Sequence, residues 1–89
     1  MIPKESLDKV WSELAHGRSV MVICRDVEVG DFGTALFDFL RPLKPKYESL
    51  SAGLGEMQMS NDTWVFVRRS ASDLRGAALD PNKVTVFFV

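Results

Sequence analysis

The 89-residue sequence contains one cysteine, one histidine and no long apolar segment. A single cysteine, Cys24, cannot form an internal disulfide, and together with His16 it supplies only two of the four ligands of a structural zinc site. The longest apolar run inside the chain, residues 20–24, is far shorter than the roughly 20 residues that cross a bilayer. The first residues lack the basic and apolar regions of a secretory signal. We therefore expect a reduced, cytoplasmic protein, of a host cell if it is viral, without a membrane partner.

The composition is typical of one globular domain. Hydrophobic residues make up 46% of the chain and charged residues 26%, and a chain of this length has room for one core. Residues 1–40 carry seven acids and four bases, whereas residues 41–89 carry seven bases and five acids. The mildly basic second half permits contact with a polyanion, although dedicated nucleic-acid domains usually have a stronger basic excess. We expect one α/β domain over residues 1–89.

The first half of the chain predicts a helix, a buried strand and a second helix. One apolar helical face is formed by Leu7, Val10, Trp11 and Leu14. The first helix is predicted over residues 3–16, with Gly17 as the left-handed residue that ends it. Residues 19–24 form a continuous apolar run, which is typical of a strand covered on both faces. Asp31 is then expected to cap a second helix, which must end before Pro42.

The second half predicts mainly strands. A short strand near residues 46–50 is followed by a glycine-rich loop. Residues 56–59 and 63–68 flank a Ser-Asn-Asp turn and predict a β-hairpin. After a helical turn begun by Ser72 or Asp73 and a turn at residues 80–82, the apolar segment 84–89 predicts a last strand that needs cover on both faces. The fold class is therefore α/β, a small mixed sheet of four to five strands with helices packed on it, in the order α-β-α-(β)-β-β-β.

This order resembles the middle of the P-loop ATPase core of the large terminase subunit, the motor that packages DNA in tailed phages. The resemblance spans residues 7–89, and its segments are GRSVMVICR at 17–25, MSNDTWVF at 59–66, DLRG at 73–76 and DPNK at 80–83. It implies a P-loop-NTPase-like core in which the strands near residue 22 and at the end of the sequence lie side by side, sandwiched by helices.

The sequence departs from that family in its nucleotide motifs. A phosphate loop of the form Gly-x4-Gly-Lys-Ser/Thr does not occur, and the acidic pair that the family places after the last strand would follow Val89. The resemblance therefore implies a core without the phosphate loop and without ATPase chemistry. We expect no cofactor.

Basic residues near the end of the predicted hairpin are the candidates for binding phosphate. The adjacent pair Arg68 and Arg69, and Arg75 beyond two serines, provide charge-assisted donors, and Lys44 and Lys46 join them if the fold brings them near. The alternative is that these charges only protect a sheet edge from aggregation. We predict that these five residues contact nucleic acid or another phosphate-bearing partner.

Two further groups of side chains have a functional and a structural interpretation. Asp26, Glu28 and Asp31 follow the central strand, where α/β sheets bind ligands, so they are candidates for a divalent metal ion or otherwise belong to a solvated loop. Aromatic residues that either stack on bases or fill the core are Trp11, Trp64, Phe66, Phe87 and Phe88. His16 is interpreted as a helix-end residue.

Without a recognisable catalytic pair, the sequence favours a non-enzymatic, phage-type accessory or regulatory protein that binds nucleic acid or another protein. One alternative is a small nucleotide- or metal-dependent enzyme that uses the acidic residues after the central strand. A further alternative is a structural protein that self-associates through a sheet edge.

Overall fold

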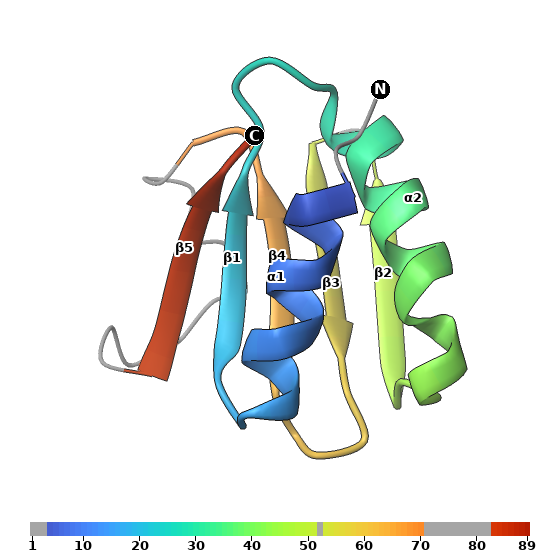
Figure 1. The fold of residues 1–89 in the computed structure, drawn as a ribbon. Helices are drawn as coiled ribbons and strands as arrows, with labels where there is room; N and C mark the ends of the chain where they lie inside the picture. Colours follow the sequence, from blue (N-terminus) through green and yellow to red (C-terminus); the bar gives the residue numbers. More distant parts are fainter. Residues whose placement is uncertain (1–3, 52, 71–82) are drawn as a thin grey trace.

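One mixed sheet with both helices on the same face makes up the described part of the chain (Figure 1). The computed structural model describes residues 4–51, 53–70 and 83–89. Within them lie helices α1 (Lys4–Ala15) and α2 (Val29–Leu40), the short 3₁₀ helix η1 (Arg41–Leu43), and strands β1 (Ser19–Ile23), β2 (Tyr47–Ser51), β3 (Leu54–Gln58), β4 (Trp64–Arg68) and β5 (Val84–Phe88). The α/β class, the five-stranded sheet and the order of elements are as the sequence predicts.

The strands are arranged in the order β2-β3-β4-β1-β5. β1 lies between β4 and β5 and runs parallel to both, with Val20 opposite Val65 on one side and Thr85 on the other. β3 pairs antiparallel with β4 and with β2, which confirms the predicted hairpin and the short strand before it. The connection from β1 through α2 to β2 is a right-handed crossover, the hand that L-residues favour (Figure 1).

Helix α1 forms where the apolar periodicity predicts it. Its buried residues Val10 and Leu14 face the sheet, and it ends where Gly17 adopts a φ of 79°. That left-handed conformation is easy only for glycine. The His16 ring nitrogen Nδ1 lies 2.7 Å from the Ser12 carbonyl oxygen, so the imidazole binds the helix end, as the sequence predicts.

The prediction that Asp31 caps α2 is wrong. The N-cap residue is Glu28, whose carbonyl oxygen accepts a 2.9 Å hydrogen bond from the Phe32 N–H, and Asp31 lies in the first turn instead. The helix begins earlier because Val29 is fully buried and contributes to the core. Asp31 still favours the helix, since a carboxylate in the first turn interacts well with the helix dipole.

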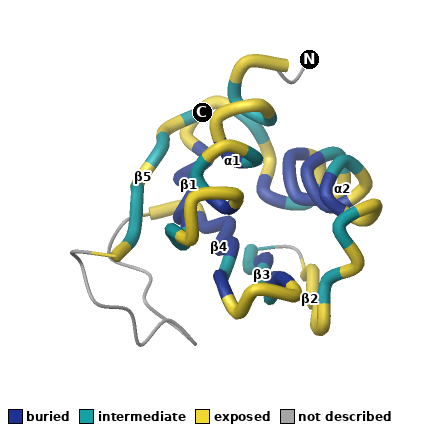
Figure 2. Tube along the Cα trace, turned by 60° about the horizontal axis from the view of Figure 1, so that its bottom comes forward, coloured by how far each residue is buried: buried dark blue, intermediate teal, exposed yellow. Residues whose placement is uncertain are grey.

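The main core lies between the helices and the sheet, where Figure 2 shows the buried parts of α1, α2, β1, β3 and β4 facing one another. Its largest side chains are Phe32, Phe37, Leu36, Leu40, Leu14 and Met57. The burial of Met57 and Met59 in this core, beside α2, is as expected. Met21, Ile23 and Phe66 form a smaller buried cluster on the opposite face of the sheet. β1 is thus buried on both faces, as the apolar run predicts.

The prediction that the last strand is covered on both faces is wrong. β5 is an edge strand, and Val86 and Phe88 expose 46% and 52% of their surface on the face away from the helices. Among the described residues both helices pack on one face, so the expected sandwich of helices on two sides is not confirmed. β5 does lie beside β1, in parallel, as the resemblance implies. The expected turns between residues 71 and 82 lie outside the described residues.

In the described segments, neither helix is long and apolar enough to cross a membrane.

Alanine substitutions at two glycines test whether the left-handed conformation of Gly17 requires glycine. A Cβ at Gly17 or Gly30 would meet no atom within 4 Å, but only Gly17 has a positive φ. We expect Gly17→Ala to lower the free energy of unfolding by about 1 kcal/mol because of left-handed strain. Gly30→Ala, within α2, should raise it by about 0.5 kcal/mol because alanine restricts the unfolded chain. Urea unfolding followed by circular dichroism measures both, and equal effects of the two substitutions would contradict the assignment.

Candidate binding surface

We call the face of the sheet on which neither α1 nor α2 packs the open face. Strand alternation and the pairing register decide which side chains it presents. They are Tyr47, Ser49 and Ser51 of β2, Leu54, Glu56 and Gln58 of β3, Trp64, Phe66 and Arg68 of β4, Ser19, Met21 and Ile23 of β1, and Val84, Val86 and Phe88 of β5. The face is therefore largely apolar, with one acidic and one basic residue on neighbouring strands.

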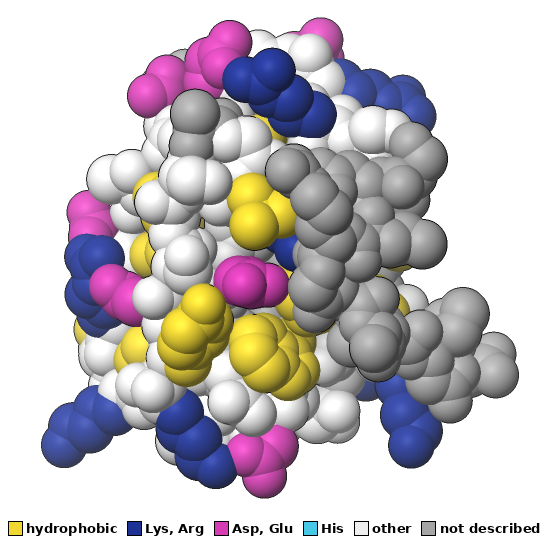
Figure 3. Space-filling view, turned by 180° about the vertical axis from the view of Figure 1, so that it is seen from behind, with side chains coloured by type: hydrophobic (Ala, Val, Ile, Leu, Met, Phe, Trp, Pro, Cys, Tyr) yellow, Lys and Arg dark blue, Asp and Glu magenta, His cyan; other side chains and the backbone are white. Residues whose placement is uncertain are grey.

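Three aromatic rings follow one another across the open face, and we call Tyr47, Trp64 and Phe66 the aromatic strip. Trp64 and Phe66 are stacked, with ring centroids 5.5 Å apart and an interplanar angle of 11°. Tyr47 meets Trp64 edge to face at 6.1 Å. Exposure increases along the strip, from buried Phe66 through partly buried Trp64 to Tyr47, which exposes 46% of its surface. Its outer end is therefore accessible to a flat ligand group. Figure 3 shows apolar side chains exposed on this side of the molecule.

The sequence predicts only two of the three residues of this strip as candidates. Trp64 and Phe66 share a face because they are two residues apart in a strand, and both are among the predicted aromatic candidates. Tyr47 joins them because β3 aligns it with Gln58, which in turn lies opposite Trp64. The sequence does predict a short strand near residues 46–50, which contains Tyr47. It does not show which strand this one pairs with, because that choice depends on the tertiary structure.

Lys44 and Lys46 lie in the sequence just before Tyr47, at the exposed end of the strip. The Lys46 ammonium donates to Asp62 Oδ1 at 2.5 Å, so half-exposed opposite charges meet beside the β3–β4 turn. Lys44 holds a left-handed conformation with φ 55°, and it takes part in no ion pair within the described part of the chain. The exposed ammonium of Lys44 is therefore available to an anionic partner.

Arg68, by contrast, is fully buried. Its Nη1 donates to the carbonyl oxygens of Gly55 at 2.6 Å and Val67 at 3.0 Å, its Nη2 lies 3.7 Å from Glu56 Oε2, and the guanidinium lies 5.2 Å from the Phe66 ring centroid. A buried cation needs such partners because desolvation is costly. This position makes Arg68 a structural residue of the open face and argues against the predicted contact with external phosphate.

The five predicted basic residues do not form one patch. Arg69 is exposed and lies 3.8 Å from a Glu28 carboxylate oxygen, at the end of β4 that is remote from Lys44 and Lys46. A strand rises by about 3.3 Å per residue, so the length of β4 separates the two groups by more than 10 Å. Arg75 lies outside the described residues. Contact of Arg69, Lys44 and Lys46 with phosphate stays a prediction.

Asp26 and Glu28 line a polar pocket of about 300 Å³ at the carboxyl ends of β1 and β4. Arg25 and Arg69 lie on the same pocket, and Arg25 also stands over the Phe88 ring at 4.1 Å. Within the segments that the structure describes, no three histidine, cysteine, aspartate or glutamate side chains come close enough to hold a metal ion. Asp26, Glu28 and Asp31 are therefore not brought together as a metal site there.

Cys24 also lines this pocket, but it is buried against the core. Burial raises the pKa of its thiol to about 11, because a thiolate is poorly solvated there. A neutral thiol is a weak nucleophile, so Cys24 does not have the properties of a catalytic cysteine.

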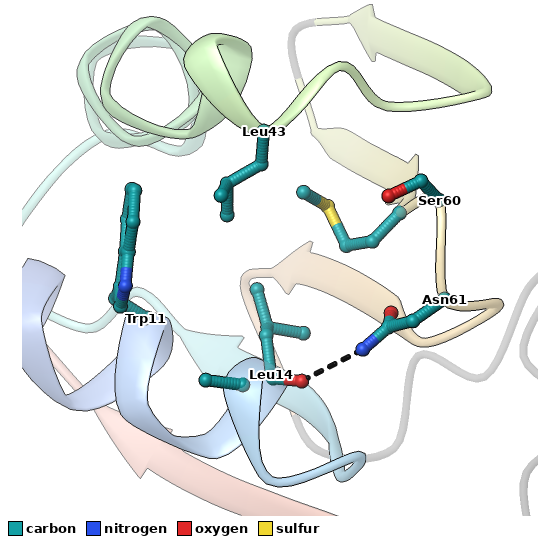
Figure 4. A pocket seen from close by; sticks show the side chains of 7 residues that line it. Trp11, Leu14, Leu43, Ser60 and Asn61 are labelled. Atoms are coloured by element: carbon teal, nitrogen blue, oxygen red, sulfur yellow. Dashed lines mark hydrogen bonds between the residues drawn. The ribbon is translucent and has the colours of Figure 1, made fainter.

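A second pocket, of about 140 Å³, lies between α1, η1 and the β3–β4 turn (Figure 4). Trp11 and Leu43 form facing apolar walls, and Asn61 closes one side by donating a 3.0 Å hydrogen bond from Nδ2 to the Leu14 carbonyl oxygen. The residues that line it carry no ionisable side chain. This pocket therefore offers apolar contact and no acid–base chemistry.

No protein-family model, curated protein or solved structure matches this chain. Its function must therefore be argued from its own surface.

The buried Arg68–Glu56 pair gives a stability prediction. Arg68→Ala should lower the free energy of unfolding by about 3 kcal/mol, because it leaves Glu56 without its counter-charge and removes the two hydrogen bonds that Arg68 Nη1 donates to carbonyl oxygens. Arg68→Leu should cost as much or more, since it keeps apolar bulk but still leaves Glu56 unpaired, whereas the double variant Arg68→Leu/Glu56→Leu should recover part of the loss. Chemical denaturation measures all three. A double variant no more stable than Arg68→Leu would show that the pair is not the cause.

Burial of Cys24 gives a second prediction. Since its pKa of about 11 lies two units above the ordinary value of 9.0, we expect its thiolate fraction near neutral pH, and with it its rate of reaction with a disulfide reagent, to be about 100-fold below that of a free thiol. The unfolded chain in denaturant, as a control, should react at the ordinary rate. Equal rates in the two states would contradict the burial.

Proposed function

We propose that this chain is a non-enzymatic binding protein that holds a single-stranded nucleic acid on its open face. The observation that carries the proposal is the aromatic strip, whose exposed end, Tyr47, directly follows Lys44 and Lys46 in the sequence. Aromatic rings on an open sheet face stack against unpaired bases, which is a common way to bind single strands.

The exposed end of the strip provides most of the affinity in this proposal. Stacking of a base on an aromatic side chain contributes about 1–3 kcal/mol, and Tyr47 and Trp64 offer ring surface for one or two bases. Two lysines neutralise few phosphates, so the logarithm of the affinity should fall with the logarithm of salt concentration with a slope of only about −1.4. Stacking should therefore dominate over charge, in keeping with a chain of net charge −1.

The pairing of Glu56 with Arg68 supports this use of the open face. An unpaired carboxylate in the middle of the face would repel the phosphate backbone of a nucleic acid. Because the Arg68 guanidinium lies beside Glu56, that negative charge is compensated within the sheet. Arg68 thus contributes to binding indirectly, and we assign direct contact to Lys44 and Lys46.

The polar pocket favours a second function, that of a small nucleotide- or metal-dependent enzyme. It lies at the carboxyl ends of two adjacent parallel strands, a common ligand position in α/β proteins. Asp26 and Glu28 offset the charges of Arg25 and Arg69 on the same pocket, so it offers no net positive charge to nucleotide phosphates. We therefore place this function after binding of a single strand.

A phage-type accessory or regulatory role is part of the proposal only through the sequence resemblance to terminase motors. The parallel pairing of β1 with β5 supports it. The open position of β5 at the sheet edge weighs against a P-loop-like core, in which that strand is covered by helices.

Fluorescence of Trp64 tests the proposal directly. In a Trp11→Phe background Trp64 is the only tryptophan, so an oligothymidine that stacks on the strip should quench its emission. Tyr47→Ala should weaken binding about tenfold, the loss expected from one stacking contact. Lys44→Ala should weaken binding and reduce its salt dependence.

The matched control is Lys9→Ala, which removes an exposed lysine from α1 on the helical side of the sheet. It should leave affinity unchanged. Absence of quenching, or equal affinity of wild type and Tyr47→Ala, would reject single-strand binding on this face. Equilibrium dialysis with Mg²⁺ and ATP tests the enzyme alternative separately.

A further inference from the structure

The outer edge of β5 carries free hydrogen-bonding groups. On its inner side, the Val89 N–H donates to the Ile23 carbonyl oxygen at 2.9 Å, and the Arg25 N–H donates to the Val89 carbonyl oxygen at 2.7 Å. Backbone groups alternate along a strand, so those of Val84, Val86 and Phe88 point away from β1. Within the described segments β1 is the one strand that pairs with β5, and no other hydrogen bond involves these outward groups.

The side chains of the same residues are unusually exposed. Val86 and Phe88 are two of the four large hydrophobic residues that the described structure exposes, and both lie on the open face. The strand sequence VTVFF contains no charge and no proline. Natural edge strands usually carry charged residues or proline, which prevent pairing with another chain. β5 itself therefore carries no protecting charge or proline, and the nearby charge is that of Arg25, whose guanidinium stands over the Phe88 ring at 4.1 Å.

The opposite edge of the sheet is different. β2 contains Glu48, whose carboxylate accepts a 3.1 Å hydrogen bond from the Arg41 guanidinium. A second copy that paired with β2 would need to approach these charges closely, and antiparallel self-pairing would bring the two Glu48 side chains near each other. β2 also exposes Tyr47 and Leu50, so the difference between the two edges is the charge of Glu48, which makes β5 the edge better suited to association with an identical strand.

We propose that two copies of this chain associate through antiparallel pairing of their β5 strands, with Val86 opposite Val86 of the second copy. This register places Val84 opposite Phe88 of the second copy, so every outward-facing residue of β5 meets another one, and each such pair exchanges two hydrogen bonds. The contact is self-complementary about a two-fold axis, as in most homodimers. It joins two sheets into one continuous sheet.

The symmetry also fixes how the two copies face. A two-fold axis between antiparallel edge strands stands perpendicular to the sheet, so the helices of both copies lie on one side and both open faces lie on the other. Val86 and Phe88 of each copy then cover apolar surface of the other. This inference rests on the β5 edge and is independent of nucleic-acid binding.

A charge placed at the symmetry axis tests the register. Val86→Lys would put two ammonium groups opposite each other, so it should convert a dimer into a monomer. Sedimentation equilibrium at several concentrations should give twice the mass of one chain for wild type and the mass of one chain for the variant. Ser49→Lys, the matched control on the open face of β2, should leave the dimer unchanged.

Circular dichroism shows whether Val86→Lys is still folded. A cysteine variant tests the same register without relying on the folding of Val86→Lys. Val86→Cys should form an interchain disulfide under mild oxidation, because directly opposed residues place their Cα atoms about 5.5 Å apart. Val84→Cys, which faces Phe88 of the second copy, should not cross-link. A wild-type chain that stays monomeric at high concentration, or equal cross-linking of the two cysteine variants, would overturn the proposal. Oligothymidine binding by monomeric Val86→Lys tests the proposed function separately.

Discussion

Parallel pairing of β1 with both β4 and β5 is the constraint on which the structure depends. β1 is apolar at nearly every position, so it is stable only where both of its faces are covered. The helices cover one face, and Met21 and Ile23 pack with Phe66 on the other. From this interior position, the chain continues from the carboxyl end of β1 through α2 to β2 at the far edge, and β3 then leads back to β4 beside β1. The placement of each surface feature follows from this path.

Pairing of Arg68 with Glu56 within the sheet leaves the open face with little net charge from β3 and β4. Arg68 is buried among the Gly55 and Val67 carbonyl groups and Glu56, so the acidic and basic residues that β3 and β4 present on that face balance each other. The rest of the face is apolar or aromatic and ends at exposed Tyr47 beside lysines. A surface of this kind is suited to flat, weakly charged contacts such as unpaired bases, and less to the dense phosphate array of a duplex.

The two edges of the sheet, β2 and β5, differ in their charge. Both edge strands expose large apolar side chains, but the Arg41–Glu48 pair adds charge at β2, whereas the strand sequence of β5 contains no charged residue. The two proposed contacts therefore lie on different parts of the molecule. The proposed ligand surface lies toward β2, and the proposed association surface lies at β5. A dimer formed through β5 would place two aromatic strips on the same side of one extended sheet.

Apolar periodicity in the sequence by itself determined α1, the central strand and the hairpin, because those patterns reflect local burial and turn chemistry. It also supplied Trp64 and Phe66 as neighbours on one face. Only the tertiary structure decided that Arg68 is buried while adjacent Arg69 is exposed, since the counter-charge and carbonyl groups come largely from β3. It also decided that Tyr47 meets Trp64 and that β5 lies at an edge. Strand order and register join residues far apart in the chain, and no local pattern encodes that choice.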